Sequence, residues 1–349
     1  MKFETYNWRW MLGLESLPAL IYFIALLWVP RSPRWLAMKK KHDEALEVLK
    51  KAIGEKPAAI EFENILASLK AESKKVRTPV VELFKPALRL VITIGIVIAI
   101  LQQITGINSV FFYAPMIFEQ SGIGTNASFS QAILVGLANL LFTIVAIWLI
   151  DKVGRKPLLV MGTTGMAISM LILSYGFHSA TYTLSADAFE TLPASLQTEA
   201  LSQIRDQTFE NDLKFQDALS KYMNEREIQT HKAELITRAI DINPLLILFG
   251  ILGFVASFAV SIGPVMWVLF SELFPNRVRG LAISFVGFIN SGVSFTVQLV
   301  FPWELANFGN ALTFLLYGIF AACGLVFILI ALPETKGKSL EELEQILVK

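Results

Sequence analysis

The chain has 349 residues, of which 54% are hydrophobic and 17% charged, and its formal net charge is +1. A nearly neutral chain without a concentrated basic face excludes a nucleic-acid partner. The single cysteine, Cys323, lies within an apolar run, so the sequence predicts neither a disulfide framework nor a zinc site. The chain contains no phosphate-binding glycine loop and no nucleophile constellation, and we therefore expect neither an enzyme nor a bound metal or cofactor.

Seven apolar segments reach the length of about 20 residues that a helix needs to cross a bilayer. They lie at 9–29, 90–118, 131–150, 157–177, 245–270, 281–302 and 311–332. Two long polar stretches, 31–89 and 178–243, separate them. The first segment does not resemble a signal peptide, because it carries Glu15 and ends in Pro-Arg-Ser-Pro instead of a small-residue cleavage site. The sequence thus predicts an all-α membrane protein.

The distribution of Lys and Arg predicts how these segments are oriented. The alternate connections 31–89, 151–156, 272–280 and 333–349 hold 22 of the 30 Lys and Arg residues. Because positively charged loops stay in the cytoplasm, this side and the carboxyl end are expected to be cytoplasmic. The stretch 178–243, with 11 acids against 6 bases, is then expected outside.

The second apolar segment contains three amides, Gln102, Gln103 and Asn108. An amide in hydrocarbon costs several kcal/mol unless a partner satisfies it, so such residues usually face a bundle interior or a water-filled cavity. Amides also hold transmembrane helices together, and this structural role is the alternative interpretation. Three amides on one segment favour a polar cavity.

Six motifs and one asparagine occur in a fixed order along the chain. They are P-R-S-P-R-W-L (30–36), Q-Q-I-T-G-I-N-S-V-F-F-Y-A-P (102–115), D-K-V-G-R-K-P (151–157), G-P-V-M-W (263–267), S-E-L-F-P-N-R-V-R-G (271–280), Asn290 and P-E-T-K-G-K-S-L-E-E-L (333–343). In this order they resemble the sugar porter branch of the major facilitator superfamily. Within that branch, the motifs are most similar to those of the proton-coupled xylose and glucose symporters and the facilitative glucose transporters.

The resemblance implies a fold of twelve helices in two six-helix halves. The seven predicted segments match the sixth to the twelfth helix only. We therefore expect seven transmembrane helices, and an incomplete chain whose N-terminal half is missing, through truncation or as a natural half-transporter. The domains that follow are the last transmembrane helix of the N-terminal half (1–30), a cytoplasmic helical linker (31–89), the C-terminal six-helix bundle (90–333) with an extracytoplasmic helical insertion (178–243), and a cytoplasmic tail (334–349).

The resemblance also implies a sugar site. A side-chain amide both donates and accepts hydrogen bonds, as a sugar hydroxyl requires. The substrate-binding positions of the family fall on Gln102, Gln103, Asn108, Asn139, Gly263, Trp267 and Asn290. Phe112 and Tyr113 would close the outer gate, with ordinary packing as the alternative. Ser291 stands where many glucose transporters carry tryptophan, so a monosaccharide is a safer expectation than glucose itself.

A set of charged residues matches the salt-bridge network that holds the cytoplasmic side of the family closed. Its members are Asp151, Arg155, Glu272, Arg279 and Glu334. The alternative interpretation is that these are ordinary charges that set the topology. Arg31 stands where the family usually has glutamate, which puts the sixth-helix part of the network in doubt.

These observations predict a carrier of a hexose or pentose that works by alternating access in the cell membrane, here a bacterial inner membrane. Its partners would be the monosaccharide, the lipid bilayer and, in the full-length protein, protons. The coupling acid of the family lies on its first helix, which none of the matched segments represents. Two alternatives stay open: a transporter-like sugar sensor or receptor, and a carrier of a polyol-like solute that is not a sugar.

Overall fold

A computed structural model describes residues 7–72, 79–122, 125–193, 196–275, 277–337 and 343. The described chain divides into two compact units, one ending before residue 79 and one beginning there. Each unit is described by itself. Of the predicted tail 334–349, only 334–337 and Leu343 belong to the described residues.

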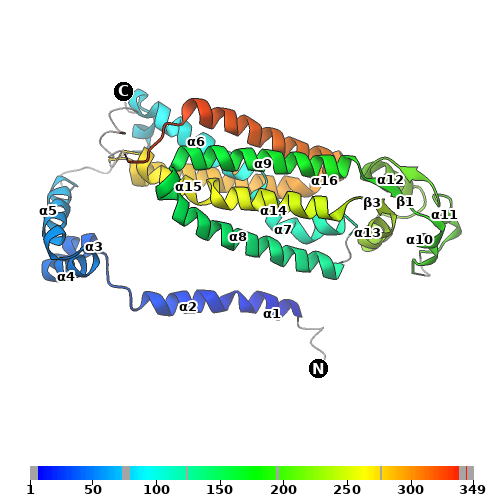
Figure 1. The fold of residues 1–349 in the computed structure, drawn as a ribbon, viewed down its shortest axis with the longest axis horizontal. Helices are drawn as coiled ribbons and strands as arrows, with labels where there is room; N and C mark the ends of the chain where they lie inside the picture. Colours follow the sequence, from blue (N-terminus) through cyan, green and yellow to red (C-terminus); the bar gives the residue numbers. More distant parts are fainter. Residues whose placement is uncertain are drawn as a thin grey trace. The chain divides into compact units, whose positions relative to one another are not determined.

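The regular secondary structure of the first unit, within its described residues, is all helix (Figure 1). Its helices are α1 (Asn7–Leu14), α2 (Ser16–Leu26), α3 (Pro33–Met38), α4 (His42–Ile53) and α5 (Glu55–Glu72). The Ser32 hydroxyl caps α3 by accepting a hydrogen bond from the Trp35 amide at 3.2 Å. Ala45 and Leu49 are buried on one face of α4, as their spacing predicts, whereas Ile60 on α5 is exposed rather than part of an apolar face.

The second unit contains a bundle of apolar helices, which run alongside one another in Figure 1. Its elements outside the insertion are η1 (Val80–Phe84), η2 (Pro86–Leu88), α6 (Arg89–Ile104), α7 (Ile107–Glu119), α8 (Thr125–Val153), α9 (Arg155–His178), α14 (Pro244–Val260), α15 (Ile262–Leu273) and α16 (Arg279–Ala331). Helix α9 packs against both α14 and α16. Large hydrophobic side chains are exposed along the bundle, among them Ile147, Phe288 and Ile330, as expected for a surface that faces lipid.

Two breaks interrupt the helices of the bundle. Helix α6 ends at Ile104, and α7 begins after Gly106, which has the left-handed conformation (φ 87°) that glycine tolerates best. Helices α14 and α15 meet at Ser261. The sequence predicts this second kink at Gly263-Pro264, but Pro264 lies in the first turn of α15, where its missing N–H costs nothing. The break therefore falls two residues earlier than predicted.

The prediction of seven spanning segments is not confirmed. Among the described residues, five helices are long and apolar enough to cross a membrane by length and composition. They are Pro86–Glu119, Ser130–Val153, Arg155–His178, Pro244–Leu273 and Arg279–Ala331. The predicted segments 281–302 and 311–332 lie on the two arms of α16, which are separated by a kink at the non-helical Gly309 (φ 72°) and are counted together as one of the five. The apolar helix in the first segment, α2, has only 11 residues.

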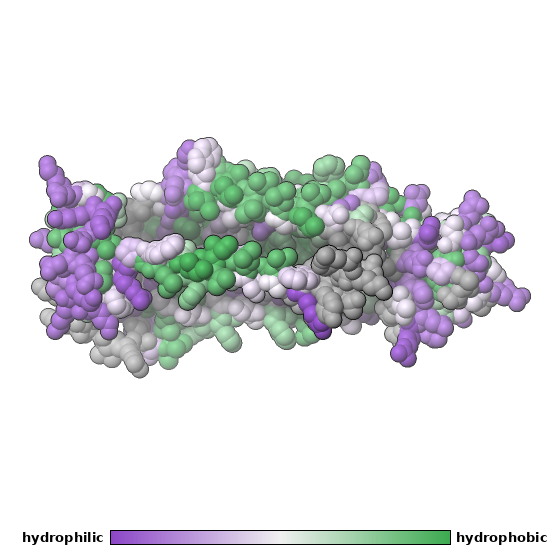
Figure 2. All heavy atoms as spheres, turned by 90° about the horizontal axis from the view of Figure 1, so that it is seen from below, coloured by the Kyte–Doolittle hydropathy of each residue, from purple (hydrophilic) through white to green (hydrophobic). Residues whose placement is uncertain are grey.

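The polar stretch 178–243 folds on a core of its own instead of forming helices alone. It contains β1 (Thr181–Thr183), α10 (Ala186–Glu190), α11 (Glu199–Ser202), β2 (Thr208–Phe209), α12 (Asp212–Ser220), α13 (Glu225–Ala239) and β3 (Ile240–Asp241). The strands form a small antiparallel sheet in the order β2-β1-β3. Tyr182, Phe215 and Leu235 are buried at its centre, and hydrophilic residues cover its surface (Figure 2). The helical insertion predicted here is therefore mixed α and β.

Candidate functional site

Four amides from three helices form one hydrogen-bonded cluster inside the bundle. Gln102 and Gln103 lie at the end of α6, Asn108 in the first turn of α7, and Asn290 on α16. Asn290 Nδ2 donates to Gln102 Oε1 at 2.8 Å, and Gln103 Nε2 donates to Asn290 Oδ1 at 3.2 Å. Asn108 Nδ2 donates to Gln103 Oε1 at 2.8 Å. The break at Gly106 lies between Gln103 and Asn108, so the hydrogen bond between them spans it.

The cluster also satisfies backbone carbonyls of neighbouring helices. Gln102 Nε2 lies 3.4 Å and 3.3 Å from the carbonyl oxygens of Ile262 and Gly263, in the first turn of α15. Asn290 Nδ2 donates to the Ala99 carbonyl at 2.9 Å. Every amide in the cluster thus has partners, as burial in a medium of low polarity requires.

Two further members of the network are Ser294 and Gln298, which the sequence reasoning did not single out. Ser294 Oγ accepts hydrogen bonds from Asn108 Nδ2 at 2.8 Å and from Gln298 Nε2 at 2.9 Å. With Asn290, these residues follow one another at intervals of four along α16. That spacing places them on one helix face, and it is the signal that identifies them.

A cavity of about 340 Å³ opens beside the cluster, at the lower end of the range in which small-molecule sites fall. The structure brings five predicted substrate-binding residues to its wall: Gln102, Gln103, Asn108, Asn139 and Gly263. The other lining residues are mostly apolar and include two aromatic rings; they are Ile107, Phe111, Thr143, Phe258, Ala259 and Pro264. Neutral amides beside aromatic and aliphatic faces can bind a solute with hydroxyls on its edges and C–H groups on its faces.

Two of the predicted substrate-binding residues do not line this cavity. Asn290 lies behind the wall, where it holds Gln102 and Gln103. Trp267 is 48% exposed and packs edge-on against Phe270 with ring centroids 6.0 Å apart. Its indole extends toward α16, where a Cβ at Gly287 would lie 3.9 Å from Trp267 Cη2, and it does not line this cavity.

The two predicted gating residues take different positions on α7. Phe112 is 68% exposed. Tyr113 packs against Phe301 of α16 with ring centroids 5.1 Å apart. Their neighbour Phe111 is the aromatic residue of this run that lines the cavity.

A second polar cluster joins the end of α8, the start of α9 and the end of α15. The Arg155 guanidinium contacts Glu272 through two nitrogens, with Nη2 2.7 Å from Oε1 and Nε 3.2 Å from Oε2. The same Nη2 lies 3.2 Å from Asp151 Oδ1. Thr335 Oγ1 donates to Glu272 Oε2 at 2.7 Å. This bidentate geometry is the strongest arrangement of an arginine and a carboxylate.

Glu334 joins the cluster through backbone amides instead of side chains. Its Oε1 and Oε2 accept hydrogen bonds from the amides of Arg155 (3.1 Å) and Lys156 (3.0 Å), which are the first residues of α9. A carboxylate at a helix N-terminus satisfies free N–H groups and complements the helix dipole. Gly154 has a φ of 104°, and a Cβ there would lie 2.9 Å from Glu334 Oε2, so the turn requires glycine.

Arg279, the fifth predicted member, donates from Nε to the Phe274 carbonyl at 3.0 Å and thereby closes the turn before α16. A neighbouring pair was not predicted: Arg277 Nη1 lies 2.8 Å from Glu82 Oε1 of η1. Among the described residues, no group of three or more His, Cys, Asp or Glu side chains is placed to hold a metal ion.

Comparison with known proteins assigns the chain to a family. The model of the sugar (and other) transporter family matches residues 2–188 and 228–347. The chain belongs to this family. The family match leaves out 189–227, which is most of the insertion predicted at 178–243.

Individual relatives are transporters and not enzymes. The chain is 34% identical over 343 residues to the arabinose-proton symporter of Bacillus subtilis, which covers 98% of this chain and 60% of that protein. It is 33% identical over 342 residues to the major myo-inositol transporter IolT of Bacillus subtilis, again covering 98% and 60%. The structure of the major facilitator superfamily proton:xylose symporter XylE, bound to 6-bromo-6-deoxy-D-glucose, matches with a TM-score of 0.65 and 31% identity, covering 99% of this chain and 60% of that one.

These matches confirm the major facilitator superfamily and its sugar porters, but not the narrower prediction. They extend over nearly the entire chain, so the expectation of a match to helices six to twelve only, with a missing N-terminal half, is not supported. The chain spans about 60% of the length of the relatives it matches.

Proposed function

We propose that the protein carries a monosaccharide, a hexose or a pentose, across the cell membrane by alternating access. The observation that supports this most strongly is the cavity of about 340 Å³ with Gln102, Gln103, Asn108 and Asn139 on its wall. A charged solute would find no fixed counter-ion there, whereas a polyhydroxylated neutral solute would find a donor and an acceptor on each amide. The relatives named for arabinose and xylose support the same solute class.

A binding titration tests the proposal directly. The purified protein is titrated with D-xylose, L-arabinose and D-glucose by calorimetry, and Gln102→Ala is compared with Gln207→Ala, the same change on the exposed surface of the insertion. We expect Gln102→Ala to weaken sugar binding at least tenfold, because a lost hydrogen bond leaves its partners in the wall unpaired. Unchanged affinity in this variant, or no binding by the unaltered protein, contradicts the proposal.

A polyol such as an inositol is the second candidate solute, and the relative named as a myo-inositol transporter favours it. It presents hydroxyls all round its ring, which suits the same amides. Competition between myo-inositol and D-xylose for the cavity separates the two candidates. Tighter binding of the inositol assigns the protein to polyols.

Proton coupling is the third part of the proposal, supported by relatives named as proton symporters. Proteoliposomes with an inward proton gradient should accumulate sugar, and a protonophore should abolish accumulation while leaving counterflow intact. Accumulation that is insensitive to the protonophore indicates another driving force.

We also propose the membrane topology and the domain roles. Residues 1–30 would form the last helix of one half, 31–89 a cytoplasmic linker, and 90–333 the other half, with 178–243 outside and the tail 334–349 in the cytoplasm. The Lys and Arg distribution supports this orientation. The cluster around Arg155 would then close the cytoplasmic side. With Cys323 replaced by serine, labelling of single cysteines introduced at Lys214 and Lys152 in intact cells tests it, since only the first is expected to react with an impermeant reagent.

A further inference from the structure

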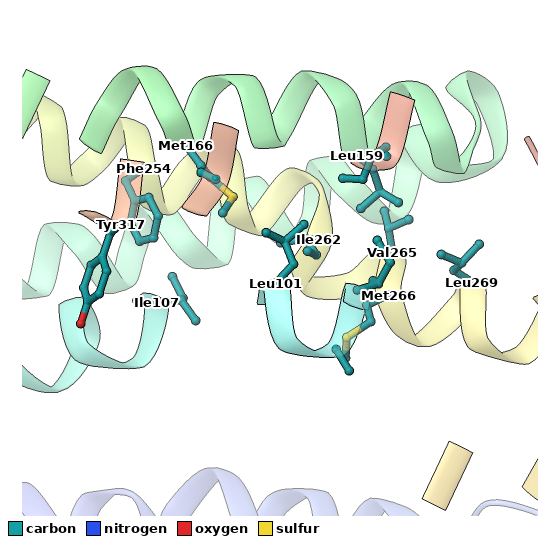
Figure 3. Close-up of a cluster of buried hydrophobic side chains, with 14 of the residues drawn as sticks. Leu101, Ile107, Leu159, Met166, Phe254, Ile262, Val265, Met266, Leu269 and Tyr317 are labelled. Carbon is teal, nitrogen blue, oxygen red and sulfur yellow. The ribbon is translucent and has the colours of Figure 1, made fainter. Parts of the chain in front are cut away.

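One aromatic ring packs directly against the break between α6 and α7. At Gly106, a Cβ atom would lie 2.4 Å and 2.5 Å from Cε2 and Cδ2 of Tyr317, so the ring touches the backbone of the break itself. Figure 3 shows Tyr317 beside Ile107, the first residue of α7. The position of this ring therefore limits how closely α7 approaches the second arm of α16.

The hydroxyl of Tyr317 is fixed by a carboxylate on the first arm of α16. Tyr317 is 2% exposed, and its OH donates to Glu304 Oε2 at 2.8 Å. A hydrogen bond from a neutral hydroxyl to a carboxylate is roughly twice as strong as one between neutral groups. The sequence alone suggests that Glu304 is a solvated charge at a helix end, but the structure gives it a buried partner.

A row of rings extends this contact to the middle of α7. Tyr317 stacks on Phe301 with centroids 6.2 Å apart and an interplanar angle of 19°. Phe301 in turn packs against Tyr113, 5.1 Å away. Helix α7 is therefore held at two points, its Gly106 cap and Tyr113, and two points define the angle of a helix.

We infer that Tyr317, held by Glu304, is a positioning residue that sets the angle of α7 and so the rate at which this segment moves in the transport cycle. Neither residue lines the cavity, so neither is placed to bind the solute. The positioning role is a property of the fold, whereas its consequence for transport rests on the proposed function. Loss of the hydrogen bond should loosen α7 while leaving the cavity wall intact.

Hydrogen exchange of the unaltered protein and its variants tests the inference without any solute. Tyr317→Phe keeps the ring and removes the hydroxyl, Glu304→Gln keeps an acceptor, and Glu304→Leu removes it. We expect amides in 107–114 to exchange on the order of tenfold faster in Tyr317→Phe and Glu304→Leu, the factor that corresponds to one lost charge-assisted hydrogen bond. Glu304→Gln should stay within about threefold of the unaltered protein, since a neutral acceptor retains part of that bond.

The control is Tyr175→Phe, the same change on an exposed face of α9, which should leave exchange in α7 unchanged. Unchanged exchange in both Tyr317→Phe and Glu304→Leu overturns the inference, as does equal loosening by Glu304→Gln and Glu304→Leu. Because the hydrogen bond is removed at Tyr317 in one variant and at Glu304 in another, the test remains possible if one of them fails to fold.

Transport provides the second measurement. If the solute assignment is correct, Tyr317→Phe should change the maximal uptake rate at least threefold while the Kd for sugar stays within twofold. A changed Kd with an unchanged rate overturns the positioning role. If the protein binds no sugar at all, the proposed function fails, but the exchange experiment still decides whether Tyr317 sets the angle of α7.

Discussion

The two polar clusters of the second unit both satisfy polar groups between packed helices, but they do so with different chemistry. Beside the cavity, four neutral amides satisfy one another and the carbonyls of Ala99 and of the first turn of α15. At the junction of α8, α9 and α15, a guanidinium and carboxylates do so with full charges. An isolated charge in the apolar middle of a bundle costs far more than an amide, whereas near the helix ends water offsets part of that cost.

The difference has a consequence for function. An amide that exchanges one neutral partner for another leaves no uncompensated charge, so the first cluster can transfer its hydrogen bonds to a solute. Separating an ion pair leaves two charges that water must solvate. The second cluster therefore favours the state in which α8, α9 and α15 stay together. The first cluster suits recognition and the second suits closure.

The largest expected effect comes from breaking the amide cluster at its centre. Asn290→Leu removes a donor from Gln102 and Ala99 and an acceptor from Gln103. We expect it to abolish measurable solute binding and to destabilise the bundle by about 2–3 kcal/mol, because these groups are left unpaired. Thermal unfolding and calorimetric titration measure both, with Asn307→Leu on an exposed face of α16 as the control. Retained binding would show that the cavity keeps its shape without Asn290.

Charge removal at the second cluster should affect stability and not recognition. Arg155→Met leaves Glu272, which is 21% exposed, without its partner and should cost about 2 kcal/mol, less than for a fully buried pair. Solute affinity should change less than twofold. The double variant Arg155→Met, Glu272→Met should recover much of the loss, since no unpaired charge remains. A double variant no more stable than the single one would show that the pair itself carries the stability.

One carboxylate of the insertion, Asp212, is buried like the amides of the first cluster but can carry a charge like the groups of the second. Asp212 is buried beside the turn at Gly309, and its Oδ2 accepts a hydrogen bond from Asn310 Nδ2 at 3.0 Å. Burial raises the pKa of Asp212 despite these hydrogen bonds and the charge of Lys232, and burial likewise lowers the pKa of Lys232. The carboxyl group is thus less acidic in the folded protein than in the unfolded chain.

The sign of the pH effect follows from that shift. The folded state holds the Asp212 proton to a higher pH than the unfolded state, so stability should fall as the pH rises from about 3.9 through the raised pKa. Asp212→Asn should remove this part of the pH dependence, measured as the melting temperature between pH 4 and pH 8. An identical pH profile in the variant would exclude Asp212 as its source.

The smallest effect is expected at the exposed edge of the charged cluster. Asp151 is 79% exposed, although its carboxylate lies 3.2 Å from Arg155 Nη2. Asp151→Asn should change stability by less than about 0.5 kcal/mol, because solvent and salt screen such a pair. Chemical denaturation at low and high ionic strength measures it. A loss of stability as large as that of Arg155→Met would mean that the greater exposure of Asp151 does not make its contact with Arg155 weaker than that of Glu272.

The sequence was most informative where spacing and chemistry act locally. Three amides on one apolar segment indicate a polar interior, and the structure places them at one cavity because Gly106 permits a break beside them. Local spacing alone does not predict the direction of the Trp267 side chain. The break falls at Ser261, ahead of Gly263, and Trp267 on the helix that follows packs against Phe270 instead of lining the cavity.

Other features depend on contacts between distant residues and so leave little trace in a local pattern. The strands of the insertion are two or three residues long, too short for a period-2 signal. Gly309 forms a kink between the two apolar arms of α16, so two predicted segments correspond to one of the five long helices. Ser294 and Gln298 are an exception, since their spacing from Asn290 was already visible.

The entrance and the exit of the insertion are neighbours. Thr181 pairs with Asp241 and Tyr182 with Ile240, so the chain leaves α9 and returns to α14 through adjacent strands. Such partners lie about 5 Å apart. A protein module whose own termini are equally close can therefore replace the segment between them without moving either helix. This makes the site a natural place for a rigid fiducial in electron microscopy.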